Sequence, residues 1–177
     1  TEAELVRRVN DELVAAWGNL VNRVVSMTHR YFDGVVPSAE ELDADDRELL
    51  DTVQEGIAAV GEEIAAVRLK AGLAKAMSLA HAANGYLTAK EPWKTAKTDL
   101  DRTGVTLGVA LNAIAGIAVA LAPYLPFTTP QVYAMLGIPE EPHWHPAVVP
   151  AGTSLGAATP LFTKLDPETL GAEDDEG

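Results

Sequence analysis

The chain has 177 residues, a length that suits one domain with a sizeable core. It contains no cysteine, which excludes disulfides, thiolate zinc sites and cysteine nucleophiles. The formal net charge is −13, and such a balance ordinarily argues against binding nucleic acid, because phosphate contacts need Lys and Arg. Much of this charge lies in acidic runs at 40–46 and 173–176, interpreted as a solvated loop or helix start and as a disordered tail.

Apolar residues recur every three or four positions from 5 to 31, which predicts one long first helix. They are Leu5, Val9, Leu13, Trp17, Leu20, Val24, Met27 and Tyr31. Asp33 and Gly34 are expected to end this helix, because glycine readily adopts the left-handed conformation found at helix ends. Pro37 then keeps the following segment extended.

Acidic residues at 43–46 predict the start of a second helix, where carboxylates meet the positive end of the helix dipole. The apolar spacing then continues from Leu49 to Leu87, which is too long for one globular helix. We therefore expect a break at 66–70 between a second and a third helix. Pro92 forces the residue before it out of the helical conformation, so Trp93 is expected on a turn past a helix end.

The residues from about 100 to 122 predict a fourth helix that is apolar on nearly all sides and therefore the most buried. The most apolar stretch of the sequence is 104–125. Its length approaches the roughly 20 residues that span a bilayer. Gly, Thr and Asn interrupt it, and Pro123 and Pro126 end it. The stretch is therefore interpreted as a core helix of a protein without a membrane partner.

A short fifth helix is expected after the proline corner, capped by Thr128 or Thr129, with Pro130 in its first turn and Gly137 at its end. The prolines farther on forbid regular structure. The predicted fold class is all-α, an up-and-down bundle of about five helices with an irregular C-terminal strap and a disordered acidic tail. The predicted regions are the bundle at 1–139, the strap at 140–166 and the tail at 167–177.

No complete catalytic pattern is present. The sequence has no GxxxxGK[ST] loop, no GxGxxG after a strand and no GxSxG. His143 and His145 are spaced like a metal pair, but their side chains would alternate in an extended segment, and no third ligand is within reach. We predict no metal site and no catalytic residue in this chain.

Polar residues gather where helix packing does not call for them. The second half of the first helix carries Asn19, Asn22, Arg23, Ser26 and Arg30. Ser26 and Arg30 are four residues apart and therefore share a helix face.

A second polar group surrounds the predicted turn at 88–94, which Asn84 precedes. There Trp93 is fixed by Pro92 and followed by Lys94, and such a Trp can stack a nucleic-acid base with a gain of ~1–3 kcal/mol. The alternative is that Trp93 closes the end of the bundle as a core residue.

Several stretches resemble the anticodon-binding domain of methionyl-tRNA synthetases, in the same order along the chain. They are WGNLVNR at 17–23, NGYL at 84–87, EPWK at 91–94, LAPYLPFT at 121–128 and PLF at 160–162. The Asn-x-Tyr and Pro-Trp elements also resemble those of the valyl, leucyl and isoleucyl enzymes.

This resemblance implies a helical bundle that docks on a class I catalytic domain of the same enzyme and grips the CAU anticodon loop of its tRNA. Trp93 would stack on the first anticodon base and Arg30 would contact base edges or phosphates. Ser26 stands where bacterial members often have Asn. Asn84, Pro92 and Lys94 complete the site that the resemblance implies.

The resemblance also implies that the parent protein is a cytoplasmic methionine–tRNA ligase, an enzyme that charges tRNA with methionine at the expense of ATP. The HIGH-like and KMSKS-like catalytic motifs of that family are missing from these residues. ATP and methionine would bind the absent catalytic domain, and no cofactor is expected in this segment. The alternatives are a helical protein-interaction module and the equivalent domain of a valyl, leucyl or isoleucyl enzyme.

Overall fold

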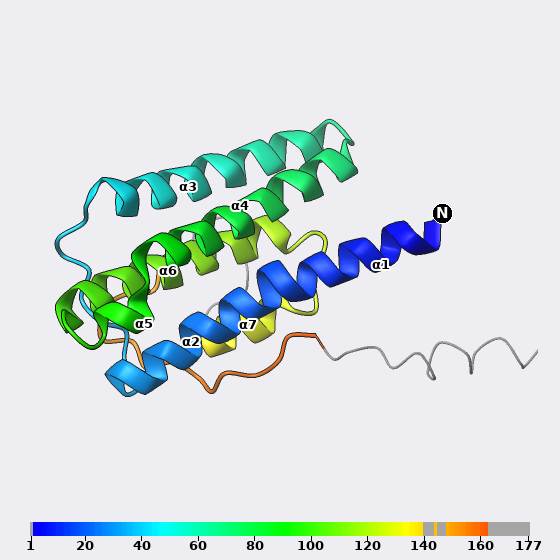
Figure 1. Cartoon of the computed structure of the whole chain (residues 1–177). Helices are drawn as coiled ribbons and strands as arrows, with labels where there is room; N and C mark the ends of the chain where they lie inside the picture. The colour runs from blue at the N-terminus through cyan, green and yellow to red at the C-terminus, as the bar shows by residue number, and fades with distance from the viewer. Residues whose placement is uncertain (1, 140–143, 145–147, 163–177) are drawn as a thin grey trace, which may run out of the picture.

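The computed structural model describes residues 2–139, 144 and 148–162. Within them the elements are α1 (Glu2–Glu12), the π-helical segment η1 (Leu13–Gly18), α2 (Asn19–Phe32), α3 (Ala44–Ala65), α4 (Leu69–Lys90), α5 (Pro92–Thr95), α6 (Leu100–Leu121) and α7 (Thr129–Met135). Figure 1 shows the long helices lying lengthwise beside one another. The described residues form no strand beyond a single bridge between Val35 and Ser154, so the predicted all-α class is confirmed.

Helix α6 is the centre of the bundle. All of its residues from 103 to 121 except Asn112 are buried, and it contacts α2, α3, α4, α5 and α7. Among the described helices it alone is long and apolar enough to cross a bilayer, yet 89% of its apolar window is buried inside the bundle. The prediction of a buried fourth helix is confirmed, because its apolar surface is covered by neighbouring helices.

The predicted single first helix is wrong in one respect. The rod begins as α1 and ends as α2, but η1 replaces the α-helical turns between them. A π turn contains one residue more than an α-helical turn. The apolar residues Leu13, Trp17 and Leu20 are still three or four positions apart, so the sequence pattern shows no break at the extra residue. Trp17 is buried in η1, with 1% of its surface exposed, and its indole fills the core at this point.

The predicted start of the second helix is confirmed by a capping box. Asp43 Oδ1 accepts from the Asp46 backbone N–H (3.0 Å), and Asp46 Oδ2 accepts from the Asp43 N–H (2.8 Å). The break expected at 66–70 is also confirmed, since α3 ends at Ala65 and α4 begins at Leu69. Between them Val67 has a positive φ of 60°, an unfavourable conformation for a β-branched residue.

The short helix α7 begins where the sequence predicts, but neither threonine caps it with its side chain. The hydroxyls of Thr128 and Thr129 donate to the Leu125 carbonyl instead, at 3.1 and 3.2 Å. The backbone of Thr128 is helical (φ −87°, ψ −27°), whereas a capping side chain needs an extended backbone. Pro130 lies in the first turn, and Gly137 follows the helix with φ 68°.

The described part of the C-terminal region, 148–162, contains no helix and lies along the bundle. Asn112 forms two hydrogen bonds with the backbone of Val149, accepting at 2.8 Å and donating at 3.2 Å. His29 Nε2 donates to the Gly156 carbonyl (2.7 Å), which attaches this segment to α2. The predicted boundary at 139/140 borders residues that the structure does not describe, and the acidic tail at 167–177 lies outside the described residues.

Candidate nucleic-acid interface

Trp93 lies at one end of the bundle, where α4 ends and α6 begins (Figure 1). Helix α4 ends at Lys90, and Glu91 adopts a left-handed conformation with φ 47°. Pro92, which is buried, then starts the one-turn helix α5, because proline fits the first position of a helix. Trp93 therefore belongs to a short helix rather than to the predicted irregular turn. Its side chain is half-buried, so part of the indole is open to solvent.

An arginine lies over this ring. The guanidinium carbon of Arg23, on α2, is 5.5 Å from the centroid of the Trp93 ring, which is a cation–π arrangement. The sequence resemblance assigned the neighbouring arginine role to Arg30, whose guanidinium instead lies 5.6 Å from the ring of Tyr31. The two arginines are seven positions apart on α2, or roughly 10 Å along the axis. The structure thus brings Arg23, not Arg30, to Trp93. From the sequence, Arg23 belonged to the polar group of the first helix but had no role of its own.

Four exposed polar residues form a continuous face of α2, which we call the α2 stripe: Asn19, Arg23, Ser26 and Arg30. The opposite face of the helix is buried in the core through Leu20, Val21, Val24, Val25 and Thr28. Ser26 Oγ donates to Asn22 Oδ1 within the helix (3.3 Å). The stripe therefore presents an amide, a hydroxyl and two guanidinium groups to solvent beside the Trp93 ring.

Asn84 lies on α4 ahead of Trp93, as the sequence predicted, and its side chain contacts the first rod. Its side-chain amide donates to the carbonyl of Ala16 in η1 (2.8 Å) and to the carbonyl of Ala80 in its own helix (3.1 Å). The π segment disturbs the regular backbone hydrogen bonds, and Asn84 satisfies one of the carbonyls there. Because both amide hydrogens are used inside the protein, this geometry favours a role in holding α4 against the first rod over a direct contact with RNA.

Lys94 is exposed and forms an ion pair with Glu91 three residues earlier (2.8 Å). Both side chains are largely solvated, so the pair contributes little to stability and Lys94 is able to exchange it for a phosphate. His143 and His145, the candidate metal pair, lie outside the described residues.

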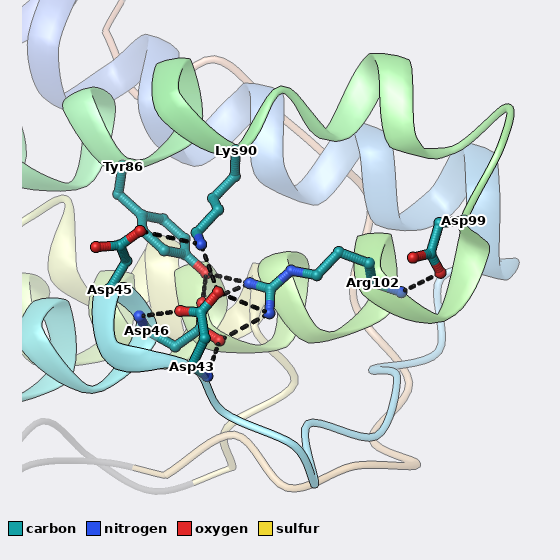
Figure 2. A network of polar contacts seen from close by, with 7 residues as sticks. All are labelled: Asp43, Asp45, Asp46, Tyr86, Lys90, Asp99 and Arg102. Carbon is teal, nitrogen blue, oxygen red and sulfur yellow. Dashed lines mark hydrogen bonds and ion pairs between the residues drawn. The ribbon is translucent and has the colours of Figure 1, made fainter.

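An acidic cluster lies at the start of α3, where side chains from the end of α4 and the start of α6 meet it (Figure 2). The fully buried carboxylate of Asp46 accepts from both terminal nitrogens of Arg102 (2.9 and 2.5 Å) and from the Tyr86 hydroxyl (2.5 Å). Lys90 Nζ contacts Asp43 at 2.6 Å and Asp45 at 3.2 Å. Part of the acidic run at 40–46 is therefore neutralised by cations of α4 and α6.

The cluster shifts the pKa values of its members in the directions expected of a tightly bound ionic network. Burial raises the pKa of the Asp46 carboxyl, but hydrogen bonds from Arg102, Tyr86 and the Asp43 backbone outweigh it and hold that pKa well below its ordinary value. The pKa of Tyr86 is raised, first by burial and then by its bond to Asp46. Asp46 is thus ionised at neutral pH even though it is buried.

Comparisons with known proteins identify the family of the chain. The pattern of the family described as the anticodon binding domain of methionyl tRNA ligase matches residues 36–173. The chain belongs to this family. The methionine–tRNA ligase of Roseiflexus castenholzii is 38% identical over 200 residues, covering 97% of this chain and 34% of that protein. The enzyme of Pyrococcus horikoshii is 38% identical over 168 residues, covering 95% and 23%.

Solved structures agree with the anticodon-binding family. The free-state crystal structure of Mycobacterium tuberculosis methionyl-tRNA synthetase matches with a TM-score of 0.87 at 26% identity, over 94% of this chain and 35% of that one. The chain thus spans about a third or less of the relatives it matches. The match favours the methionyl family over the valyl, leucyl and isoleucyl relatives and over a general protein-interaction module.

Proposed function

We propose that this chain reads the anticodon loop of a tRNA as part of a methionine–tRNA ligase. The observation that carries the proposal is the half-buried Trp93 ring with the Arg23 guanidinium over it, where Arg23 is part of the exposed α2 stripe. Bases of an anticodon loop are unpaired, so they are available for stacking on aromatic side chains and for hydrogen bonds along their edges. Such recognition needs few cations, which makes it compatible with an acidic chain.

The first anticodon base would stack on the solvent-exposed part of the Trp93 ring. Arg23, whose guanidinium carbon lies over the ring at 5.5 Å from its centroid, would move from the ring face to the edge of that base. A guanidinium offers two parallel N–H donors, and cytosine presents two adjacent acceptors, O2 and N3, on its pairing edge. Uracil has a donor at N3, so it mismatches one of the two bonds. This pairing would select the C of a CAU anticodon.

The rest of the α2 stripe would contact the neighbouring nucleotides. Arg30 lies farther along the same exposed face, and Ser26 stands between the two arginines. Lys94, next to Trp93, would bind a phosphate in place of its solvated pair with Glu91. In this arrangement Pro92 and Asn84 fix the positions of α5 and of the first rod.

The proposal extends to the parent protein. A class I catalytic domain of the same enzyme would activate methionine with ATP and charge the tRNA, while this chain contributes tRNA selection. ATP and methionine would bind that catalytic domain, and this segment would need no cofactor. We place the enzyme in the cytoplasm, without a membrane partner.

Binding of anticodon stem-loops tests the proposal. One stem-loop carries CAU and a second carries a changed first base, and Kd is measured for each with the 177-residue chain. We expect tighter binding of the CAU loop. Trp93→Ala should weaken that binding roughly 5- to 150-fold, the equivalent of one lost stacking contact.

Trp144→Ala is the matched control, because Trp144 is 41% exposed but lies beside Gly61 of α3. It should leave the Kd unchanged. Equal affinity for both loops, or equal losses from the two Trp variants, would contradict anticodon reading. If Trp93→Ala leaves RNA binding intact but abolishes binding to a protein partner, the interaction-module alternative is correct.

A further inference from the structure

The segment that carries Trp93 is tied at both of its ends to the first turn of α3. At the start of the segment, Lys90 binds Asp43 (2.6 Å) and Asp45 (3.2 Å). At its end, Arg102 binds Asp46 through both terminal nitrogens, at 2.9 and 2.5 Å. Figure 2 shows these side chains converging from α4 and α6 on one turn of α3. Two anchors separated in the sequence therefore meet at one place.

The anchor itself is held firmly. Asp46 has no exposed surface, and it accepts hydrogen bonds from Arg102, Tyr86 and the Asp43 backbone. A bidentate pair between arginine and carboxylate fixes both distance and orientation. Breaking a buried pair leaves an uncompensated charge, so this turn resists displacement relative to α6.

The interior of the segment is fastened as well. The hydroxyls of Thr95 in α5 and Thr103 in α6 lie 2.6 Å apart. Asp99 caps α6 by accepting from the backbone N–H of Arg102 at 3.1 Å. These contacts hold α5, the helix that carries Trp93, against the start of α6.

We propose that the first turn of α3, through Asp43 and Asp46, is a positioning element for base recognition: by holding Lys90 and Arg102 it sets the Trp93 ring opposite Arg23. This inference rests on the proposed function. Neither carboxylate touches RNA in this account. It explains why acidic residues are found next to a surface that would bind a polyanion.

The variant Asp43→Asn separates this role from simple electrostatics, because the two accounts predict changes of opposite sign. Asparagine caps a helix as well as aspartate does, so the start of α3 is retained. The ion pairs of Asp43 with Lys90 (2.6 Å) and with Arg102 (3.4 Å) are lost, and so is one negative charge, while Lys90 keeps its contact with Asp45 (3.2 Å). If the carboxylate acts only through its charge, CAU stem-loop binding becomes tighter. If the carboxylate positions the Trp93 ring, CAU stem-loop binding should instead weaken by about three- to tenfold, because part of the free energy of one base stacking contact is lost.

Glu63→Gln is the matched control. It also removes one carboxylate from a short ion pair, that between Glu63 and Arg68 (2.6 Å), but at the opposite end of the bundle. We expect unchanged affinity for both stem-loops. In Asp43→Asn the ratio of affinities for the CAU loop and the changed loop should also fall, which a general loss of stability does not produce while the variant remains folded.

Lys90 provides a second test. Lys90→Met should weaken CAU binding and leave the slope of log K against log salt unchanged, whereas Lys90→Arg should restore the affinity. If Lys90 binds a phosphate directly, its loss instead reduces that slope by about 0.7. Such a reduction would overturn the positioning role of this residue.

The outcomes separate this inference from the function on which it rests. Unchanged or tighter binding by Asp43→Asn, while Trp93→Ala still weakens binding, overturns positioning and leaves anticodon reading in place. If Trp93→Ala has no effect on either stem-loop, the proposed function fails first. Weaker and less selective binding by Asp43→Asn, with Glu63→Gln unaffected, supports the inference.

Discussion

Each end of the bundle has an ion pair between an arginine and a carboxylate, but one pair is exposed to solvent and the other is buried. At the α3–α4 connection, Val67 is 80% exposed with a positive φ, and the ion pair of Arg68 with Glu63 is solvated. At the Trp93 end, the corresponding ion pair of Arg102 with Asp46 is buried and linked to a tyrosine. Burial makes the second pair costly to break and geometrically specific. The buried ion pair thus lies at the end of the bundle that carries the proposed binding surface.

The largest expected effect comes from removing the buried anchor. Asp46→Ala leaves the charge of Arg102 without its buried partner and should lower the free energy of unfolding by about 3–5 kcal/mol. Urea denaturation measures it. Glu63→Ala, at the solvated end, should change stability negligibly. Similar losses in both variants would remove the contrast between the ends.

The core beneath the solvated end is nevertheless well packed. Leu121, at the end of α6, is 1% exposed, so Leu121→Ala should cost ~2–5 kcal/mol of stability. Trp93→Ala should cost less, because its ring is only half-buried. Thermal melting of both variants makes the comparison. A melting shift for Trp93→Ala as large as that for Leu121→Ala would indicate that Trp93 serves mainly as core.

Lowering the pH should remove the stabilisation that the Asp46 carboxylate provides at the Trp93 end of the bundle. The pKa of Asp46 is well below its ordinary value in the folded chain, whereas an unfolded aspartate titrates at about 4. The stabilisation from this carboxylate is therefore complete above about pH 4 and is lost as the pH falls further. Unfolding free energies measured from pH 6 to pH 2 should fall less steeply in Asp46→Asn. Parallel curves for the two proteins would exclude this contribution.

The smallest effect is expected at the strained residue of the other end. Val67 has φ 60° and an exposed side chain, so Val67→Gly should remove backbone strain and raise stability by about 1 kcal/mol. Denaturation midpoints test this increase. A loss of stability would show that the valine makes contacts that outweigh its conformation.

Local signals predicted the helices well. The acidic start of α3, the break near 66–70 and the buried α6 each depend on a few adjacent residues or on one apolar period, and the structure confirms all three. The π segment escaped prediction because its inserted residue fits the spacing of apolar residues. The hydrogen bonds from the Thr128 and Thr129 hydroxyls to the Leu125 carbonyl depend on the backbone angles of the segment before α7. The residue types alone do not determine those angles.

The site depended on contacts that are distant in the sequence. Trp93 could be identified from the residues of its turn. Whether Arg23 or Arg30 lies over the Trp93 ring depends on where α5 packs along α2. The link between Asp46 and Arg102 joins residues 56 positions apart, and no local pattern marks it. The partner of Asn84 is a carbonyl of the π segment, so that contact could not be predicted before the segment itself.

If Trp93 and Arg23 read one base together, their contributions to CAU stem-loop binding are coupled, and a double-mutant cycle measures this coupling. Trp93→Ala, Arg23→Ala and the double variant are compared with a second cycle that uses Arg30→Ala. Our account predicts that the losses for Trp93 and Arg23 are non-additive by about 0.5–3 kcal/mol, while those for Trp93 and Arg30 add. Additive losses in the first cycle and coupling in the second would contradict it.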